Sequence, residues 1–436
     1  MILTLDLGTS STKATVWGGS GPVSQGRGPV PTTCPRPGWA EQEPSDWWQS
    51  VIVACQQLDS DALAAVDGVG FSAARETFAL IGSDGEPLGP GILWSDRRAG
   101  SALARLSWVS RHQPERFAAA RWVMAPRDLI VFLLTGQPAT DRTVAARAGL
   151  IDLAGSPVEL AAPLLPPLLD PAGVVGRAEA GPATAIGIRP GTPVFAGAGD
   201  RPCEVLGTGV GPAGAMVSWG TTANTSRAVA TFPDPVPGGG RASPGALGGW
   251  LVEYGLSSAG GAIDWLAQLT GRTSIELTDA MAEVPPGAGG VVAVPWLNGA
   301  RAPWWQPAAE AAFFQLTPAH GPQHLTRALY EGVAFDVARS LEAAGGADRI
   351  GAAGRGAATS AWIGMLAAVT GRAVERRRAA ADAASAGACL LVDPDLALDD
   401  INPVVEIVEP DPGLVACYRP VRDRSDEACR AVLRLS

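Results

Sequence analysis

The residues Met1-Ile-Leu-Thr-Leu-Asp6-Leu-Gly-Thr9-Ser-Ser-Thr-Lys13-Ala-Thr-Val-Trp17 open the chain with two apolar runs joined by a turn that contains glycine. Two such runs around a small-residue turn predict a β-hairpin. Asp6 ends the first run, and hydroxyl residues and a lysine follow it. Small residues let backbone N–H groups approach a phosphate, and a carboxylate can hold Mg²⁺ through water. A surface turn capped by Asp6 and Thr9 is the alternative.

Lys13 is the only lysine in the chain, and every other side-chain cation apart from histidine is an arginine. A compact ammonium and a planar guanidinium are not interchangeable as phosphate ligands. The position of the single lysine, Lys13, therefore favours a phosphate site at this turn.

The length of 436 residues predicts two domains of about 200 residues each. A hydrophobic content of 47% supports sizeable cores, and the formal net charge of −10 argues against a nucleic-acid or anionic membrane partner. The six cysteines are scattered without a CxxC pair, which argues against a disulfide framework or a zinc site. No targeting or membrane-spanning segment is visible, so we expect a cytoplasmic protein without a membrane partner.

A second turn repeats the pattern of the first. An apolar strand at 216–218 is followed by Trp219-Gly220-Thr221-Thr222, again a glycine with hydroxyl residues. Each turn begins its own series of strands and helices. We therefore expect two similar halves, residues 1–212 and 213–436, that face each other across a cleft.

Local patterns predict further elements. The Pro- and Gly-rich residues 18–43 are typical of a loop, and 65–72 of a strand. Helices are predicted near 44–58, 96–111, 126–136, 200–207, 257–270, 322–344, 360–369 and 380–391, with a last helix from about 425.

Asp200 follows Gly197 and Gly199 at a predicted helix start, where the positive end of the helix dipole favours a carboxylate. Asp200 is therefore either an ordinary N-cap or a general base that accepts a proton from a hydroxyl. Arg75 and Glu76 follow a predicted strand. They form either a solvated pair or a donor–acceptor pair for substrate hydroxyls.

Taken in order, these segments resemble the motifs of the FGGY carbohydrate kinases, which belong to the actin/hexokinase/heat-shock-ATPase superfamily. The matching segments are residues 6–13 (first phosphate motif), 39–48 and 93–99 (N-terminal domain segments), 197–200 (base motif), 218–222 (second phosphate motif) and 354–357 with Trp362 (adenosine motif). The resemblance covers nearly the whole chain. It implies an α/β fold of two ribonuclease-H-like (actin/hexokinase-type) domains and an enzyme that transfers phosphate from ATP to a small sugar or polyol.

The resemblance also implies a role for each residue of the site. Asp200 is the catalytic base, and Mg²⁺ is held by Asp6, through water, and by Asp200. The residues implied for ATP are Gly8, Thr9, Ser10, Lys13, Gly220, Thr221, Gly354, Gly356 and Ala357. Those implied for the substrate are Arg75, Glu76, Asp200, Arg201, Trp94 and Asn224, with a core position as the alternative for Trp94.

The residues at the positions that determine substrate specificity favour two different substrates. The overall pattern is xylulokinase-like, which favours a ketopentose such as xylulose. Arg75-Glu76-Thr77 instead resembles the glycerol kinases, whose matching Arg and Glu bind polyol hydroxyls. Arg201 stands where the family usually has Asn or Gln, and the segment 99–125 is shorter than in the family. A polyol kinase and a catalytically weak sugar-binding regulatory protein are the alternatives, and the oligomeric state stays open, a homodimer included.

Overall fold

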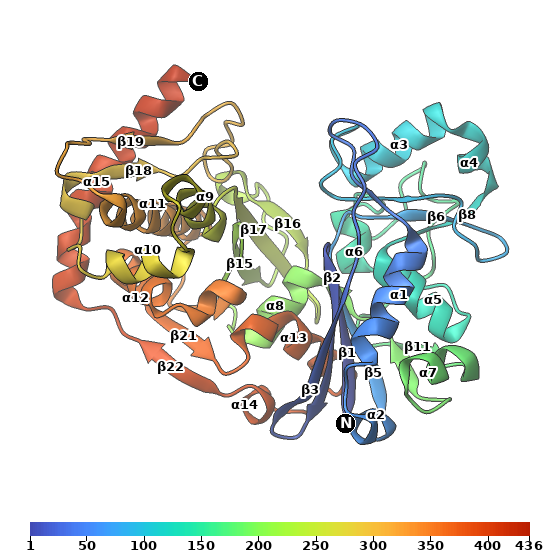
Figure 1. Ribbon diagram of the computed structural model, residues 1–436. Coiled ribbons are helices and arrows are strands. Elements are labelled where there is room, and N and C mark those ends of the chain that lie inside the picture. The colour runs from blue at the N-terminus through green and yellow to red at the C-terminus, as the bar shows by residue number, and fades with distance from the viewer. The chain divides into compact units, whose positions relative to one another are not determined.

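The computed structural model describes all residues, 1–436, and the chain forms two compact α/β units (Figure 1). Unit 1 comprises Met1–Gly207, Ser243–Gly248 and Ala384–Pro403. Unit 2 comprises Thr208–Ala242, Gly249–Ala383 and Val404–Ser436. Two short segments from the second half of the sequence therefore belong to the first unit.

Unit 1 is built on a sheet with the strand order β11-β12-β5-β1-β2-β3, and β13 pairs with β5 as well. The hairpin predicted from the opening stretch is confirmed as β1 and β2, which pair antiparallel, and β1 also pairs in parallel with β5. The strands are β1 (Ile2–Leu7), β2 (Ser11–Gly18), β3 (Gly21–Pro29), β5 (Gly68–Ala73), β11 (Val174–Arg177), β12 (Pro193–Phe195) and β13 (Ala198–Gly199).

The loop predicted for residues 18–43 is partly wrong, because β3 continues the hairpin as a third antiparallel strand. Helix α1 (Pro44–Cys55) packs directly on this strand. A Cβ on Gly26 would lie 2.0 Å from the carbonyl oxygen of Ala54, and one on Gly28 would lie 1.9 Å from that of Ser50. The glycines of β3 therefore permit a close contact between helix and sheet, whereas their sequence pattern is that of a loop.

One face of the unit 1 sheet is covered by α1, α5 (Pro126–Thr135) and α7 (Ala180–Ile186), which lie together in Figure 1. Trp47, Val51 and Ile130 from these helices form one core with Leu3 and Leu5 of β1. Because side chains alternate along a strand, the residues between these leucines point to the opposite face.

That opposite face is covered by α13 (Ala383–Val392), a helix from the C-terminal half of the sequence. Its Ser385 Oγ lies 2.6 Å from Thr4 Oγ1, and Trp17 Nε1 donates hydrogen bonds to both oxygens. A Cβ on Gly70 of β5 would lie 2.7 Å from a carbonyl oxygen of α13, so strand and helix backbones touch. Asp6 shares this face with Thr4.

The remaining elements of unit 1 are short. Three two-stranded sheets pair β4 (Glu41–Gln42) with β7 (Gly91–Ile92), β6 (Ala79–Gly82) with β8 (Ala120–Met124), and β9 (Thr140–Asp141) with β10 (Leu168–Leu169). The other helices are α2 (Ser60–Ala64), α3 (Ala102–His112), α4 (Pro114–Ala119), α6 (Arg142–Arg147), α8 (Asp200–Thr208) and α14 (Leu398–Ile401).

Unit 2 repeats the pairing pattern of unit 1, with the strand order β16-β17-β15-β14-β20-β21-β22. The hairpin β14–β15 is extended by the antiparallel β17, two parallel strands follow on the other side, and the antiparallel β22 ends the sheet. The strands are β14 (Ala215–Trp219), β15 (Ala223–Val229), β16 (Arg241–Pro244), β17 (Trp250–Leu256), β20 (Arg349–Ala353), β21 (Ala373–Arg377) and β22 (Val404–Val408). Two sheets with the same pairing pattern, one in each unit, are therefore present.

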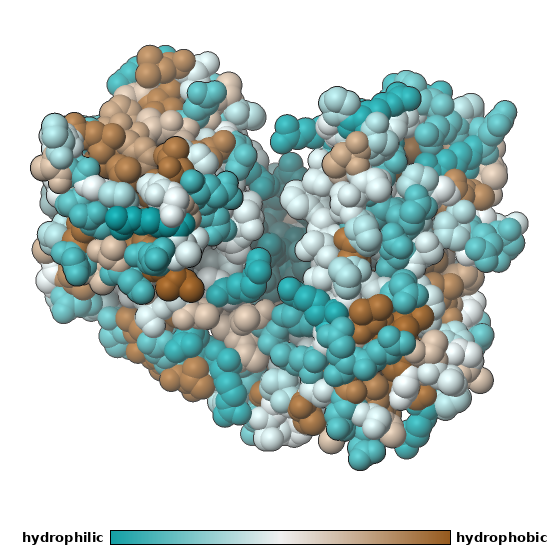
Figure 2. All heavy atoms as spheres, in the orientation of Figure 1, coloured by the Kyte–Doolittle hydropathy of each residue, from teal (hydrophilic) through white to brown (hydrophobic).

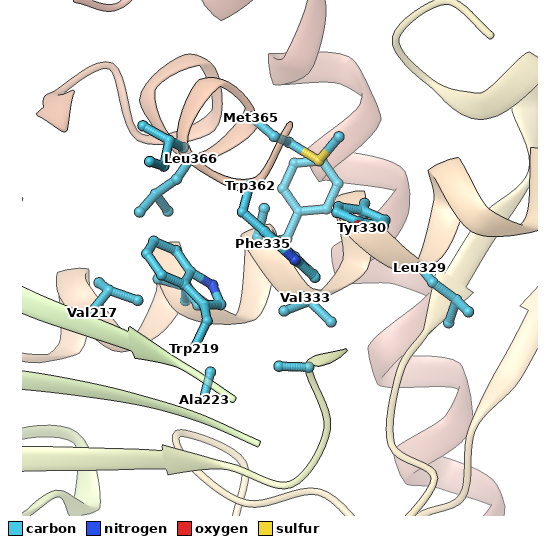
Figure 3. Close-up of a cluster of buried hydrophobic side chains, with 14 of the residues drawn as sticks. Val217, Trp219, Ala223, Leu329, Tyr330, Val333, Phe335, Trp362, Met365 and Leu366 are labelled. Carbon is cyan, nitrogen blue, oxygen red and sulfur yellow. The ribbon is translucent and has the colours of Figure 1, made fainter. Parts of the chain in front are cut away.

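The unit 2 core lies between this sheet and its helices, as Figure 3 shows. Trp219 at the end of β14 is 1% exposed and lies near Trp362, with ring centroids 6.4 Å apart. The helices are α9 (Gly260–Thr270), α10 (Ser274–Met281), α11 (Pro322–Ala343), α12 (Ser360–Thr370) and α15 (Pro412–Leu435), and β18 (Val292–Val294) pairs with β19 (Ala312–Phe314). Four short 3₁₀ turns complete the chain: η1 (Pro237–Gly239), η2 (Ala288–Gly290), η3 (Arg355–Ala358) and η4 (Ala380–Asp382).

Two predicted helix starts are wrong. The last helix, α15, begins at Pro412 and not near 425, and it contains Pro420 in its interior, where proline is usually a sign of a helix boundary. The helix predicted from 96 begins only at Ala102, where the side chain of Ser101 accepts a hydrogen bond from the amide of Ala104.

On the face shown in Figure 2, exposed hydrophobic residues are scattered among hydrophilic ones. None of the helices has both the length and the apolar character that crossing a membrane requires. The residues predicted to bind phosphate lie in the turns that follow β1 and β14.

Candidate active site

The turn between β1 and β2 carries three residues predicted to bind phosphate. Gly8 and Ser10 are exposed, and Thr9 is partly buried. Thr9 is fixed from two sides, because Trp94 Nε1 donates to its Oγ1 at 2.8 Å and Gln42 Nε2 donates to its carbonyl oxygen at 2.6 Å. The turn thus keeps one conformation while its small residues leave the backbone open to a ligand.

Asp6 lies opposite Lys13 in the β1–β2 register and accepts a hydrogen bond from Ser72 Oγ at 2.9 Å. Burial raises the pKa of Asp6 from 3.8 to about 6, and the carboxylates of Asp200 and Glu204 add to the rise. The hydrogen bond from Ser72 and the charge of Lys13 lower the same pKa. Carboxylates that disfavour one another's ionisation form a site where a divalent cation is favoured.

Asp200 is the first residue of α8. Its Oδ1 accepts hydrogen bonds from Arg75 Nε at 2.9 Å and from the amide of Arg201 at 2.8 Å, whereas its Oδ2 accepts none. Pro202 offers no N–H two residues on, so Asp200 lacks the bond that an N-cap side chain often makes there. Its side chain is 32% exposed, which leaves Oδ2 able to meet a substrate hydroxyl.

Arg75 and Glu76 follow β5 directly. The buried Arg75 reaches Asp200, and its NH1 lies 3.4 Å from Ser243 Oγ. Glu76 has a φ of 68°, a left-handed conformation that residues other than glycine seldom adopt. Arg147 NH2 lies 3.2 Å from Glu76 Oε2. Residues other than glycine that are held in such a sparsely populated conformation cluster at functional sites.

The carbonyl oxygen of the same Glu76 accepts a hydrogen bond from Arg105 NH2 at 2.8 Å. Burial lowers the pKa of Arg105, while the charges of Glu76 and Asp96 raise it. Arg105 is 1% exposed, so this contact holds the Glu76 backbone from within the protein.

Three further predicted substrate residues occupy different surroundings. Trp94 is 49% exposed, which contradicts the alternative that it belongs to the core. Arg201 forms an ion pair with Glu204, one helical turn further along α8. Asn224 lies on β15 in unit 2, where its Oδ1 accepts a hydrogen bond from Ser226 Oγ at 2.6 Å.

The β14–β15 turn of unit 2 packs against the start of α9. The amides of Gly260 and Gly261 donate to the carbonyl oxygens of Gly220 and Thr221, both at 3.0 Å. A Cβ on Gly260 would lie 2.8 Å from the Gly220 carbonyl oxygen, so the close contact requires glycine.

A cavity of about 460 Å³ opens beside this turn, entirely within unit 2. It contains the predicted residues Gly220, Thr221 and Gly356, and its aromatic wall consists of Tyr330 and Trp362, whose rings stack with centroids 4.0 Å apart (Figure 3). The other lining residues are Gly260, Ile263, Asp264, Ser274, Ile275, Thr278, Asp279, Arg355 and Thr359. Aromatic and aliphatic side chains thus share the lining with several polar and charged ones, a mixture that can hold a polar organic ligand.

The other two residues of the predicted adenosine motif do not line this cavity. Gly354 has a φ of 77°, and a Cβ there would lie 2.4 Å from the carbonyl oxygen of Trp219. Ala357 is completely buried. A Cβ on Gly356 would lie 2.5 Å from Trp219 Cβ, so both glycines let η3 lie against the end of β14, and Gly356 also faces the cavity.

Comparison with known proteins decides the family. A model of the FGGY family of carbohydrate kinases, N-terminal domain, matches residues 1–104 and 99–207, and its C-terminal counterpart matches residues 215–392. The chain belongs to the FGGY family of carbohydrate kinases. The predicted fold class, two actin/hexokinase-type α/β domains, and the prediction of a carbohydrate kinase are thereby confirmed.

Individual FGGY relatives are similar along nearly the full chain. The xylulose kinase of Escherichia coli K12 is 28% identical, with 97% of both chains covered. A glycerol kinase of Verminephrobacter eiseniae is 30% identical over 79% of both chains. The crystal structure of a xyloylose kinase from Brucella ovis matches with a TM-score of 0.89 at 25% identity, covering 100% of this chain and 99% of that chain.

The FGGY kinases transfer phosphate from ATP, for which a metal ion is the expected cofactor. No three His, Cys, Asp or Glu side chains are grouped as a preformed metal site. Mg²⁺ commonly keeps several waters and takes only one or two carboxylates besides substrate phosphates. The partly buried Asp6 and the neighbouring Asp200 fit such a site, since the pKa of Asp6 rises partly through the charge of Asp200.

Several residues that line or support these sites carry no motif that marks them in the sequence. Thr278 and Tyr330 line the cavity and are joined by a hydrogen bond of 3.0 Å between their hydroxyl oxygens. They lie on α10 and α11, whose sequences carry no nucleotide motif. The same holds for Thr143, whose Oγ1 accepts a hydrogen bond from the amide of Gly199. Its contact partner lies 56 residues away, so no local pattern could have indicated it.

Proposed function

We propose that this FGGY kinase transfers a phosphoryl group from ATP to a hydroxyl of a ketopentose, with xylulose as the first candidate. The observation that carries the proposal is the geometry of Asp200, which Arg75 holds through Oδ1 while Oδ2 accepts no hydrogen bond. In this proposal the N-terminal domain, 1–212, supplies the sugar site and the base. The C-terminal domain, 213–436, supplies the second phosphate motif and the adenosine site.

In the proposed reaction, Asp200 Oδ2 accepts the proton of the attacking sugar hydroxyl, whose oxygen then bonds to the γ-phosphorus as the bond to ADP breaks. The backbone and hydroxyl groups of Gly8, Thr9 and Ser10 donate hydrogen bonds to phosphate oxygens, and Lys13 adds a positive charge. Gly220 and Thr221 do the same from the second motif. When bound, Mg²⁺ neutralises charge on the phosphates, and Asp6 and Asp200 are the residues that hold it.

Adenosine is assigned to the unit 2 cavity. In this proposal the base contacts the apolar part of the lining, to which Ile263, Tyr330 and Trp362 contribute. The carboxylates of Asp264 and Asp279 line the same cavity and are suitable acceptors for ribose hydroxyls.

The choice of xylulose rests on the similarity to xylulose kinases. A second candidate, glycerol or another polyol, is favoured by the consecutive residues Arg75 and Glu76, because a guanidinium can donate to one hydroxyl of a polyol and a carboxylate can accept from another. The similarity to glycerol kinases agrees with this candidate.

The test is an assay of ADP release coupled to NADH oxidation, with purified full-length protein and a panel of ketopentoses, aldoses, sugar acids and polyols. Xylulose should give the highest kcat/KM. Highest activity with glycerol would replace the first candidate by the second. ADP release that is independent of every added sugar and polyol would contradict the proposal.

A further inference from the structure

The segment that carries Asp200 is held at both ends by side chains from two other helices. At its start, Arg127 NH1 on α5 donates a hydrogen bond of 2.7 Å to the carbonyl oxygen of Ala196. At its end, Thr143 Oγ1 on α6 accepts a hydrogen bond of 2.8 Å from the amide of Gly199. Only one peptide bond separates this second contact from Asp200.

A buried ionic network fixes these two side chains relative to each other. Asp141 Oδ1 accepts a hydrogen bond from the Thr143 amide at 2.7 Å, and its Oδ2 lies 2.7 Å from Arg127 NH2. Asp128 Oδ1 accepts two further bonds from the same guanidinium. Arg127, Asp128, Asp141 and Thr143 are each no more than 2% exposed. Breaking such a network is costly, because it leaves a buried charge or polar group unpaired.

Backbone pairing of β13 with β5 also supports the base segment, but residues 196–199 are alanines and glycines and offer no side-chain hydrogen bond of their own. Gly197 has a φ of 72°, and a Cβ there would lie 2.5 Å from the Phe71 carbonyl oxygen. A Cβ on Gly199 would lie 2.4 Å from Arg75 Cδ, so the stem of Arg75 lies directly on the glycine. The segment therefore cannot carry anchoring side chains at these positions, and its strand, β13, has only two residues.

We propose that Thr143, backed by Arg127 and Asp141, is a positioning residue that sets the place of Asp200. The inference rests on the proposed function, in which Asp200 is the base. A threonine hydroxyl that accepts from Gly199 fixes the peptide plane between Ala198 and Gly199, one residue before Asp200. A displacement of the base by a fraction of an ångström reduces turnover without altering the nucleotide site.

The test compares Thr143→Val with Thr143→Ser in the full-length kinase. Valine keeps the size and β-branching of threonine but removes the acceptor, whereas serine keeps the acceptor. We expect Thr143→Val to lower kcat by about tenfold to a hundredfold, with the KM for ATP changed less than about twofold. Thr143→Ser should restore kcat to within about threefold of the original protein. If the valine variant does not fold, Thr143→Ala removes the acceptor without adding bulk.

A second measurement does not depend on activity. Hydrogen exchange of the Gly199 amide should accelerate at least about tenfold in Thr143→Val, while the amides of β1 stay protected. A kcat for Thr143→Val within about twofold of the original, or equal losses in the serine and valine variants, would overturn the inference.

Combination with Asp200→Asn separates this inference from the proposed function. If Thr143 acts through the base, Thr143→Val should cause no further loss in the Asp200→Asn background. Full activity of Asp200→Asn itself would contradict the proposed function. An inactive Asp200→Asn beside a fully active Thr143→Val would contradict only the positioning role.

Discussion

The β1–β2 turn of unit 1 and the β14–β15 turn of unit 2 occupy the same place in two sheets with the same pairing pattern. Each hairpin ends with an apolar residue on its first strand, Leu7 in unit 1 and Trp219 in unit 2. One pair further back, unit 1 places Asp6 opposite Lys13. At the matching position, unit 2 places Ser218 opposite Asn224, so a charged pair is replaced by a neutral one.

The surroundings of the two turns also differ, with ionisable groups near the first turn and a cavity beside the second. Burial and the neighbouring carboxylates raise the pKa of Asp6 in unit 1. In unit 2 the turn instead adjoins the start of α9 and a cavity walled by Tyr330 and Trp362. The comparison indicates that the same sheet pattern can place either a carboxylate or an open cavity beside its turn, according to the residues one pair behind the turn and the elements packed against it.

The strongest test of this division is Asp200→Asn, which removes the proposed base from unit 1 and leaves unit 2 intact. We expect kcat to fall by about 10³-fold, since general-base groups contribute about 10²–10⁴-fold. Binding of ADP, measured by calorimetry, should be unchanged. Retention of near-normal turnover would show that unit 1 does not supply the base.

Asp6→Asn compared with Ser218→Ala tests the matched strand positions directly. Asp6→Asn should lower kcat by about 10²-fold and raise the Mg²⁺ concentration needed for half-maximal rate, because a charged metal partner is lost. Ser218→Ala should change kcat by less than about threefold. Steady-state rates over a Mg²⁺ titration measure both effects. An equal loss of kcat in the two variants would contradict the assignment of the metal-binding role to Asp6 and not to Ser218.

The raised pKa of Asp6 also predicts an effect on stability. The pKa of the Asp6 carboxyl is about 6 in the folded protein and 3.8 in the unfolded chain. The free energy of unfolding therefore falls as the pH rises between these values, because the folded protein binds more protons there than the unfolded chain does. Without Mg²⁺, Asp6→Asn should therefore raise the free energy of unfolding above pH 6 by at most about 3 kcal/mol. The gain should vanish near pH 4. Urea denaturation between pH 4 and 8 measures it, and a variant less stable at pH 7 would contradict the cause given for the shift.

In unit 2, Gly356→Ala should affect the nucleotide and not the sugar. The added Cβ would meet Trp219 Cβ at 2.5 Å and force η3 to shift at the cavity wall. We expect the KM for ATP to rise about tenfold, with the KM for the sugar unchanged. Gly364→Ala on α12 is the matched control, because a Cβ there meets no atom within 4 Å. A rise in the KM for ATP in both variants would argue against a local effect.

The smallest effect is expected from Trp94→Phe, which removes the indole N–H that donates to Thr9. One lost hydrogen bond of about 1 kcal/mol corresponds to roughly a fivefold lower kcat. Stopped-flow or steady-state rates with saturating sugar measure it. An unchanged kcat would show that the first turn keeps its conformation without this contact.

The sequence by itself determined the features that short segments encode. The β1–β2 hairpin and the repeated turn at Gly220 follow from apolar runs around small residues. Asp200 at a helix start and Arg75-Glu76 at a strand end were also identified from local patterns, together with the resemblance to the FGGY kinases. These patterns depend on neighbours a few residues apart, which is why they are readable without a structure.

Only the tertiary structure decided which distant residues meet. The glycines of β3 could not be distinguished from loop glycines until α1 was found against them. Ser385 lies 381 residues from Thr4 along the chain, yet their hydroxyl oxygens are 2.6 Å apart. The hydrogen bond that Thr143 accepts beside Asp200, and the meeting of α10, α11 and α12 around the cavity, depend in the same way on packing. Such contacts are selected by the burial of whole helix and sheet faces, and no local sequence pattern specifies them.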